Sequence, residues 1–307
     1  MKPKVIVIAG PTASGKTALS IELAKKINGE IVSADSMQIY KYMNIGTAKP
    51  TKEEMQDIKH YLLDFVSPEE RFSVAQYQEL AQEAINKIIS KGKVPIVVGG
   101  TGLYINSLVY GIKFEQTEVD MKYRTLLEER VNKEGLEVLY EEAKKIDPTA
   151  MQKISPNDQK RIIRVLEIYK QTGKTKTEQE EESRKQEIPF DYKVFVLEMD
   201  REKLYERINR RVDLMLGQGL IAEVEEIYKK YSHFPTAMQG IGYKEVVSYL
   251  ENEISEEEMI EKIKQETRRY AKRQITWFKK DENWKKINAL DTLQNNINII
   301  LEEYSER

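Results

Sequence analysis

The chain has 307 residues, of which 40% are hydrophobic and 33% are charged, enough for one large domain or two smaller ones with a sizeable core. Its 49 basic and 51 acidic side chains give a net charge of −2, so any binding of nucleic acid must come from local basic patches. There is no cysteine and there are two histidines, which excludes disulfides, thiolate metal sites and a histidine-rich zinc centre.

No segment is typical of a secretory leader or a membrane span. The apolar run after Lys4 is short and continues directly into a loop, unlike the apolar region of a signal peptide. No window approaches the roughly 18 apolar residues that a membrane-spanning helix needs. We therefore expect a cytoplasmic protein without a membrane partner.

The first predicted element is a buried strand over residues 4–9 that leads into a phosphate-binding loop. The loop, GPTASGKT, contains the full G-x4-G-K-T pattern, and helical apolar spacing follows it to about residue 28. Glycines let successive N–H groups and the next helix N-terminus face a phosphate. Lys16 adds a positive charge, and the Thr17 hydroxyl is a usual Mg²⁺ ligand. We therefore predict that these residues bind a phosphorylated ligand: Gly10, Pro11, Thr12, Ala13, Ser14, Gly15, Lys16 and Thr17.

A second strand is predicted over residues 30–33, followed by the segment ADSMQIY at 34–40. Ligands of parallel sheets bind beyond the carboxyl ends of the strands, so the loop after this strand should lie near the phosphate loop. Asp35 is therefore expected to face the site. The alternative is that Asp35 caps a helix, because aspartate is a preferred N-cap residue.

The next segments are a loop at 46–50, a short strand at 60–65 and a helix from Ser73 to Lys91. A further buried strand over 94–98 ends in the glycine-rich turn GGTG, where an NTP hydrolase usually has an acidic residue that helps to hold Mg²⁺. We interpret these glycines as room for a ligand to approach the backbone closely. The turn argues against a motor ATPase.

From about residue 113 to residue 189 the chain is charged and helix-prone, without a convincing strand, and strand character returns at 192–199. The predicted fold is α/β. A P-loop NTPase-like parallel sheet flanked by helices occupies residues 1–112 and 190–307, and an all-helical insertion domain occupies residues 113–189.

Two basic segments follow the resumed sheet. Arg207 and Arg211 lie at i, i+4 on one side of a predicted helix, either as anion ligands or as a solvated face. Residues 268–280 carry six basic and no acidic side chains, with a tyrosine, a tryptophan and a phenylalanine among them. That composition suits contact with the phosphates and bases of a nucleic acid. The alternative is an amphipathic helix whose aromatic residues lie in the core.

Together these motifs resemble the bacterial tRNA dimethylallyltransferases (isopentenyl transferases). The shared motifs, in chain order, are GPTASGKT at 10–17, ADSMQIY at 34–40, GTAKP at 46–50, VGGTGLY at 98–104, ND at 157–158 with Arg161 and Arg164, GYKE at 242–245 and TRRYAKRQITWF at 267–278. The phosphate loop alone is shared with many kinases, whereas the later motifs in this order are more specific. Tyr61 departs from the family, which usually has a second histidine after His60. The zinc finger of eukaryotic members cannot form without cysteine.

The resemblance implies transfer of a dimethylallyl group from dimethylallyl diphosphate to the exocyclic N6 amine of the adenine immediately 3′ of a tRNA anticodon. The nucleotide-binding (ATP-binding) type of loop would hold the leaving diphosphate, with Mg²⁺ on Thr17 as cofactor. Asp35 would be the general base, and Thr101 would lie where the prenyl group and the base meet. Arg207 and Arg211 could add positive charge, and we favour Arg211. We expect a monomer.

The target adenine must leave the anticodon stack to reach such a site, where it would be flipped into a central channel. Ser36 and Gln38 could contact its edges, because amide side chains pair well with adenine. For Arg161 and Arg164 the alternative is an ion pair with Asp158 or Glu167. The predicted contacts with the tRNA anticodon stem-loop are Asp35, Ser36, Met37, Gln38, Gln159, Lys160, Arg161, Ile162, Ile163, Arg164, Gly242, Tyr243, Lys244, Arg268, Arg269, Lys272 and Arg273.

Three other functions are alternatives to this one. An adenylate isopentenyltransferase is disfavoured by the helical insertion and the basic segment. A nucleotide or small-molecule kinase is disfavoured by the missing acidic residue after Val98. A non-catalytic tRNA-binding protein is disfavoured by the intact Lys16, Thr17 and Asp35.

Overall fold

The computed structural model describes residues 2–112, 120–185 and 187–305. The chain divides into two compact units, Met1–Val109 with Pro189–Arg307 and Tyr110–Ile188. These boundaries lie close to the ones expected at residues 112 and 189. The larger unit contains the sheet, and the smaller unit is helical.

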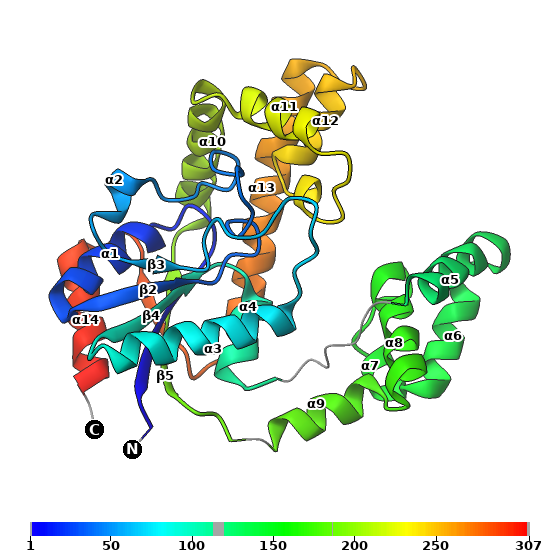
Figure 1. Cartoon of the computed structure of the whole chain (residues 1–307), viewed down its shortest axis with the longest axis horizontal. Coiled ribbons are helices and arrows are strands. Elements are labelled where there is room, and N and C mark those ends of the chain that lie inside the picture. Colours follow the sequence, from blue (N-terminus) through cyan, green and yellow to red (C-terminus); the bar gives the residue numbers. More distant parts are fainter. Residues whose placement is uncertain (1, 113–119, 186, 306–307) are drawn as a thin grey trace. The chain divides into compact units, whose positions relative to one another are not determined.

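Among the described residues, the larger unit contains a six-stranded sheet in the order β3-β2-β4-β1-β5-β6 (Figure 1). All neighbouring strands pair in parallel, as predicted. The strand that precedes the phosphate loop lies inside the sheet, because β1 pairs with β4 on one side and β5 on the other. The strands are β1 (Lys4–Ala9), β2 (Gly29–Ser33), β3 (His60–Tyr61), β4 (Val94–Gly99), β5 (Asp191–Glu198) and β6 (Lys285–Asn288).

Helices cover both faces of this sheet. Val5 and Val7 of β1 pack in the core formed with α3 (Val74–Ser90) and α4 (Gly102–Val109). Ile6 and Ile8 pack in the core formed with α1 (Lys16–Ile27) and α14 (Leu293–Ser305). Because both faces are covered, β1 has a continuous apolar sequence rather than an alternating one.

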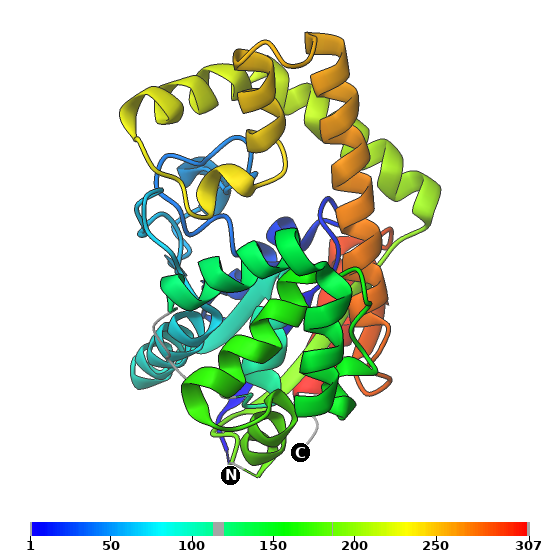
Figure 2. The ribbon, with the colours of Figure 1, turned by 90° about the vertical axis from the view of Figure 1, so that its right-hand side faces the viewer.

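A second group of helices follows β5 and shares a core with the segment after β2. The group consists of α10 (Arg201–Gly217), α11 (Leu220–Lys230), the 3-10 turn η1 (Ala237–Gln239), α12 (Tyr243–Leu250) and α13 (Glu256–Phe278). Helix α2 (Lys52–Met55), a single turn between β2 and β3, is not part of this group. α13 is one long helix of 23 residues, drawn in orange in Figure 2. Met259, near its start, packs with α11 and α12, and Phe278 at its end reaches the core beside the sheet.

The smaller unit is helical throughout its described residues. Leu127, Leu139, Ile162 and Leu166 form part of its apolar core. Within that core the fully buried carboxylate of Glu167 accepts hydrogen bonds from the guanidinium of Arg124, at 2.7 Å from Nε and 2.8 Å from Nη2. The helices are α5 (Met121–Glu134), α6 (Leu136–Ile146), α7 (Pro148–Met151), α8 (Gln159–Thr172) and α9 (Lys176–Arg184).

Two elements of the larger unit differ from the sequence prediction. The strand expected at residues 60–65 is limited to His60–Tyr61, because the chain turns at Leu62 and Asp64, which have φ values of 60° and 59°. The edge strand β6 and the helix α14 were not predicted. In β6 only Ile287 is buried, so the sequence contains no apolar run to reveal it.

Tyr61, the position that departs from the family pattern, lies in an ion cluster at the β3 edge of the sheet. Its hydroxyl donates to Glu30 Oε2 at 2.7 Å, and Lys91 and Lys93 pair with the same carboxylate at 2.8 and 2.9 Å. Burial raises the pKa of Glu30, but the hydrogen bonds from Lys91, Lys93 and Tyr61 outweigh burial and lower it to about 2. Tyr61 therefore has a structural role in this chain.

No helix in the described part of the chain is both long enough and apolar enough to cross a lipid bilayer.

Candidate active site

The phosphate loop joins β1 to α1 and has the backbone geometry that its glycines predict. Gly10 and Gly15 have φ values of 145° and 95°, and a Cβ on Gly10 would lie 2.9 Å from the carbonyl oxygen of Leu197. Ala13 packs with two helices that follow later in the chain, α10 and α13. The Ser14 hydroxyl is buried without a hydrogen-bond partner among the described residues, so a bound anion would satisfy it.

This loop lines a cavity of about 790 Å³ that is shared with the segments after β2 and β4. The volume is within the range of small-molecule sites. Residues 12–17 of the predicted phosphate-binding loop line it, together with Asp35, Gln38 and Arg211, which were predicted as catalytic or base-contacting. Tyr270 and Gln274 of α13 also line it. The fold therefore brings segments of the larger unit that are far apart in the sequence to one cavity.

Two of the basic side chains that line this cavity, Lys16 and Arg211, have lowered pKa values. The ammonium of Lys16 donates to the carbonyl oxygens of Gly10 and Pro11 at 2.9 and 2.6 Å. Burial, followed by the positive charge of Arg211, lowers the pKa of Lys16 to about 7, against the opposing effect of Asp35. Burial also lowers the pKa of Arg211. A bound polyanion would raise the pKa of Lys16 and of Arg211 again, because an opposite charge favours the charged form of each group.

The structure distinguishes the two arginines, of which Arg211 is the one favoured from the sequence. Arg211 is half-buried and lines the cavity. Arg207, one turn earlier on α10, is exposed, and its Nη1 lies 3.9 Å from the sulfur of Met199. Arg211 is therefore the better-placed ligand for an anion.

Asp35 is fixed in a tight turn after β2. Its Oδ1 accepts the N–H groups of Met37 and Gln38 at 2.8 and 3.3 Å. This is an aspartate turn rather than a helix cap, because turns and no helix follow. The N–H of Ser36 donates to Thr101 Oγ1 at 3.0 Å, and that hydroxyl donates to Ser36 Oγ at 3.3 Å. The ends of β2 and β4 thus bring the predicted base and Thr101 together.

The GTAKP segment is held from α11 by a single carboxylate. Tyr243 donates its hydroxyl to Glu223 Oε1 at 2.6 Å, and a Cβ on Gly46 would lie 2.5 Å from the Tyr243 ring. Glu223 also accepts three successive backbone N–H groups, at 2.9, 2.8 and 3.1 Å, from Asn44, Ile45 and Gly46. The segment is therefore fixed where Thr47 and Ala48 line the cavity.

Several residues predicted to contact tRNA make contacts within the protein. Gln38 Nε2 donates to the carbonyl oxygens of residues 47 and 48 at 3.1 and 3.2 Å. Tyr243 and Ile162 are buried in the cores of their units, and Gly242 begins α12 with a φ of 94°. We assign Tyr243 and Ile162 packing roles. Met37 is half-buried, and Lys244 is exposed on α12.

The glycines after β4 make room for other parts of the protein, and two of them, Gly99 and Gly100, also line the cavity. A Cβ on Gly99 would lie 2.1 Å from the carbonyl oxygen of Ala34. On Gly100 it would lie 2.3 Å from Gln274 Nε2, and on Gly102 2.4 Å from the Trp277 ring. Helix α13 and the end of β2 therefore pack directly on this turn.

α13 has a basic outer face and an aromatic inner face. Arg269, Lys272 and Arg273 are exposed, while the half-buried Arg268 donates to Asn209 Oδ1 at 2.6 Å. Tyr270 and Trp277 are half-buried and Phe278 is buried, as the alternative of an amphipathic helix predicts, and Tyr270 also lines the cavity. Burial, followed by the charge of Asp35, raises the pKa of Tyr270 to about 12.

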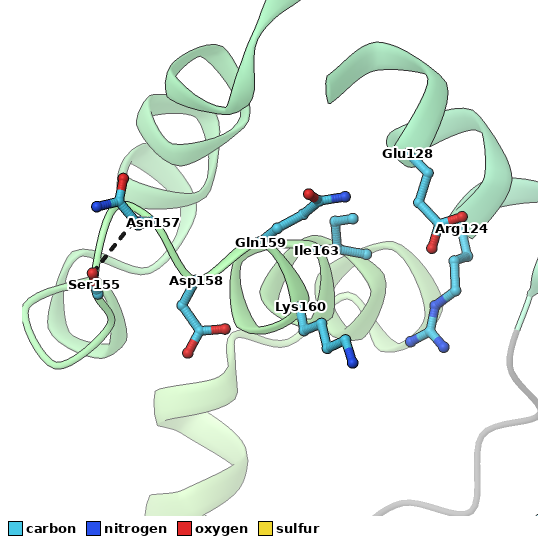
Figure 3. Close-up of a pocket in the computed structure, with 8 residues that line it drawn as sticks. All are labelled: Arg124, Glu128, Ser155, Asn157, Asp158, Gln159, Lys160 and Ile163. Carbon is cyan, nitrogen blue, oxygen red and sulfur yellow. Dashed lines mark hydrogen bonds between the residues drawn. The ribbon is translucent and has the colours of Figure 1, made fainter. Parts of the chain in front are cut away.

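The helical unit has a hollow of its own, of about 730 Å³ (Figure 3). The predicted residues Gln159, Lys160 and Ile163 line it. Arg161 pairs with Asp158 at 3.2 Å and Arg164 with Glu167 at 3.5 Å, so both ion pairs considered as the alternative are present. The two arginine side chains are nevertheless 66% and 40% exposed. The complete lining is Arg124, Glu128, Ser155, Asn157, Asp158, Gln159, Lys160 and Ile163.

The donor set of the cavity fits a magnesium ion that arrives with a phosphate ligand. The Thr17 hydroxyl and the Asp35 carboxylate both line the cavity. Mg²⁺ usually binds one or two protein oxygens and completes its shell with phosphate oxygens and water. The described residues contain no group of three or more His, Cys, Asp or Glu side chains that could hold a metal by themselves.

Sequence patterns predict no role for Gln274 or Glu223, and they indicate Tyr270 only as one of the aromatic side chains of the basic segment. Tyr270 and Gln274 are four residues apart and Trp277 follows three later, a helical spacing that could have shown a common inward face. Glu223 gives no comparable signal, because its partners lie on a distant segment.

Residues 38–281 match the protein family described as IPP transferase. The chain is 56% identical over 280 residues to the tRNA dimethylallyltransferase of Acetivibrio thermocellus, covering 91% of this chain and 90% of the relative. It is 52% identical over 283 residues to the enzyme of that name from Thermoanaerobacter pseudethanolicus, with the same coverage.

Two solved structures show the same similarity in three dimensions. The tRNA isopentenylpyrophosphate transferase of Bacillus halodurans is 42% identical with a TM-score of 0.73, covering 98% of this chain and 97% of that one. A eukaryotic dimethylallyltransferase acting on tRNA is 34% identical with a TM-score of 0.81, covering 99% of this chain and 80% of that one.

Proposed function

This chain belongs to the IPP transferase family, and from that membership we propose that it is a tRNA dimethylallyltransferase. It transfers a dimethylallyl group from dimethylallyl diphosphate to the N6 amine of the adenine immediately 3′ of the anticodon. One observation carries the proposal: a single cavity joins a complete phosphate loop and two cations, Lys16 and Arg211, to the carboxylate of Asp35. A phosphate site and a base in one cavity suit displacement of diphosphate by an amine.

The diphosphate end of the reaction depends on positive charge. As the carbon–oxygen bond to the diphosphate breaks, the loop N–H groups, Lys16 and Arg211 stabilise the negative charge that develops on the leaving oxygens. Mg²⁺ on Thr17 would supply further Lewis-acid stabilisation. The half-burial of Arg211 strengthens its effect, because charges interact more strongly away from water.

The acceptor end of the reaction needs a base. The new carbon–nitrogen bond gives the N6 nitrogen a positive charge, and Asp35 accepts the proton that leaves it. The turn N–H groups on Oδ1 keep the carboxylate in place. Thr101, whose hydroxyl accepts the N–H of Ser36, would lie beside the flipped adenine where the two substrates meet.

Each unit offers its own surface to the anticodon stem-loop. The larger unit presents Lys244, Arg269, Lys272 and Arg273 as exposed basic groups. The helical unit presents the first turns of α8, including Lys160 and Arg161. We propose that the enzyme acts as a monomer, and its tRNA substrate implies a cytoplasmic location.

The decisive experiment is single-turnover transfer to an anticodon stem-loop, with dimethylallyl diphosphate or ATP as the second substrate and with AMP as an alternative acceptor. We expect prenylated adenine only with the stem-loop and dimethylallyl diphosphate. Phosphoryl transfer from ATP would show a kinase, and prenylated AMP would show an adenylate isopentenyltransferase.

Asp35→Asn tests the base in the same assay. Asparagine retains an oxygen for the N–H groups of Met37 and Gln38 but cannot take a proton, so we expect the rate to fall by about 10³-fold. RNA affinity should stay within about twofold of the native value, because the turn persists. Asp57→Asn, at an exposed position that is not part of the cavity lining, is the matched control. An unchanged rate in Asp35→Asn would exclude Asp35 as the base.

A further inference from the structure

Helix α13 contains a buried glutamine that the mechanism above does not use. Gln274 is 6% exposed and reaches two loops that are distant from it in sequence. Its Oε1 accepts the N–H of Thr12 in the phosphate loop at 2.9 Å. Its Nε2 donates to the carbonyl oxygen of Gly100, beside Thr101, at 2.9 Å. One amide therefore joins the loops that follow β1 and β4.

The surrounding structure is built closely around this amide. A Cβ on Gly100 would lie 2.3 Å from Gln274 Nε2. The turn can therefore approach the amide this closely only because residue 100 is a glycine. Ala271, three residues earlier on α13, packs in the same small core as Ala13 of the phosphate loop. α13 thus supports the phosphate loop through both an apolar contact and a hydrogen bond.

Glutamine matches the chemistry of both loops. It presents an acceptor to an N–H group and a donor to a carbonyl group from one rigid plane. Glutamate has the same size and keeps the acceptor, but it places a carboxylate oxygen against the carbonyl of Gly100. Leucine has a similar size and loses both hydrogen bonds, which leaves a buried N–H and C=O without partners.

We propose that Gln274 is a positioning residue for prenyl transfer. Through Thr12 and Gly100 it sets the phosphate loop, which holds the diphosphate, at a fixed distance from the turn that carries Thr101. The two substrates must meet across this distance, and a misplacement of about 1 Å can cost about 100-fold in rate. The inference rests on the proposed function, and it concerns geometry rather than contact with the reacting atoms.

The test compares Gln274→Glu and Gln274→Leu with the full-length native protein. We measure the single-turnover transfer rate at saturating substrates, calorimetric affinity for inorganic diphosphate with Mg²⁺, RNA affinity and thermal stability. For Gln274→Glu we expect the saturated rate to fall at least about tenfold and the diphosphate affinity several-fold, because the loops separate. RNA affinity and folding should stay near native values. Gln265→Glu, the same change at an exposed position of α13, should alter none of these quantities.

A second pair of variants tests the geometry directly. Gly100→Ala should slow transfer, because its methyl group collides with the amide, and Gln274→Ala should slow transfer by releasing both loops. In the variant that carries both substitutions the collision is gone. The fold reduction in its transfer rate should therefore be smaller than the product of the reductions in the two single variants. Multiplicative losses would contradict the proposed contact.

The inference is overturned if Gln274→Glu and Gln274→Leu both transfer within twofold of the native rate, or if the rate falls only in proportion to the folded fraction. Should Gln274→Leu fail to fold, Gln274→Glu decides alone. Failure of the proposed function is a separate result, because then the native protein itself would neither bind diphosphate nor prenylate the stem-loop.

Discussion

The cavity of the larger unit and the α8 surface of the helical unit hold their basic residues in opposite ways. Lys16 and Arg211 are withdrawn from water, and burial lowers the pKa of both. Arg161 and Arg164 keep much of their surface exposed and pair with acidic groups of their own unit. Because water and salt weaken exposed charge interactions, the first arrangement suits stabilisation of a reaction and the second suits reversible binding of RNA.

The largest effect expected from this comparison concerns the two arginines of α10. Arg211→Gln removes a half-buried charge from the cavity, so we expect single-turnover transfer to slow by about 100-fold or more. Arg207→Gln removes an exposed charge, and the loss should be about threefold or less, because solvent screens it. Equal losses in the two variants would show that burial does not separate their roles.

A smaller effect is expected from pH. Lys16 has a pKa of about 7 in the free protein, and a bound diphosphate favours its charged form. Above pH 7, Lys16 must take up a proton when diphosphate binds, so the affinity for diphosphate should fall by up to about tenfold per pH unit as the pH rises. Below pH 6, where Lys16 is already protonated, its contribution to the affinity should not change with pH. Calorimetry with inorganic diphosphate from pH 6 to 9 measures it.

Lys16→Met is the control for this titration, because protonation of diphosphate itself affects both proteins equally. The native protein should show the steeper pH dependence, and only it should take up the additional proton. Identical pH dependences would contradict the assignment to Lys16.

The smallest effect is expected on the helical unit. Arg161→Gln should weaken binding of the anticodon stem-loop by several-fold and reduce the slope of log affinity against log salt by about 0.7 to 1, as expected for one lost phosphate contact. The rate at saturating RNA should not change, since the arginine takes no part in the chemistry. Lys133→Gln on α5, another exposed cation of this unit, is the matched control. A changed saturated rate would place Arg161 in the reaction itself.

The position and the backbone conformation of the phosphate loop could be predicted because the signal for them is local. The apolar run of β1, the two glycines, Lys16 and Thr17 are contiguous, and the backbone geometry that they need is set by neighbouring residues. The same holds for the start of α3, where the Ser73 side chain accepts the N–H of Gln76. Family resemblance then supplied the reaction, which periodicity alone could not.

Spatial relations between distant segments could not be predicted in this way. Which arginine of α10 enters the cavity depends on how that helix packs, since both lie on one side of it. The glycines after β4 signalled a close approach, but the approaching groups, Gln274 and Trp277, are far away in sequence. The hydrogen bonds that Glu223 accepts from the backbone of residues 44–46 are also contacts between segments that are distant in the sequence.

The sequence by itself therefore determined the parallel sheet, the phosphate loop, the helical insertion and the reaction class. Only the tertiary structure decided that Arg211 rather than Arg207 lines the cavity, that α13 turns its aromatic side chains inward, and that Gln274 joins two loops. The physical reason is that local patterns follow from backbone geometry and periodic burial, whereas these contacts exist only once separate segments have packed together.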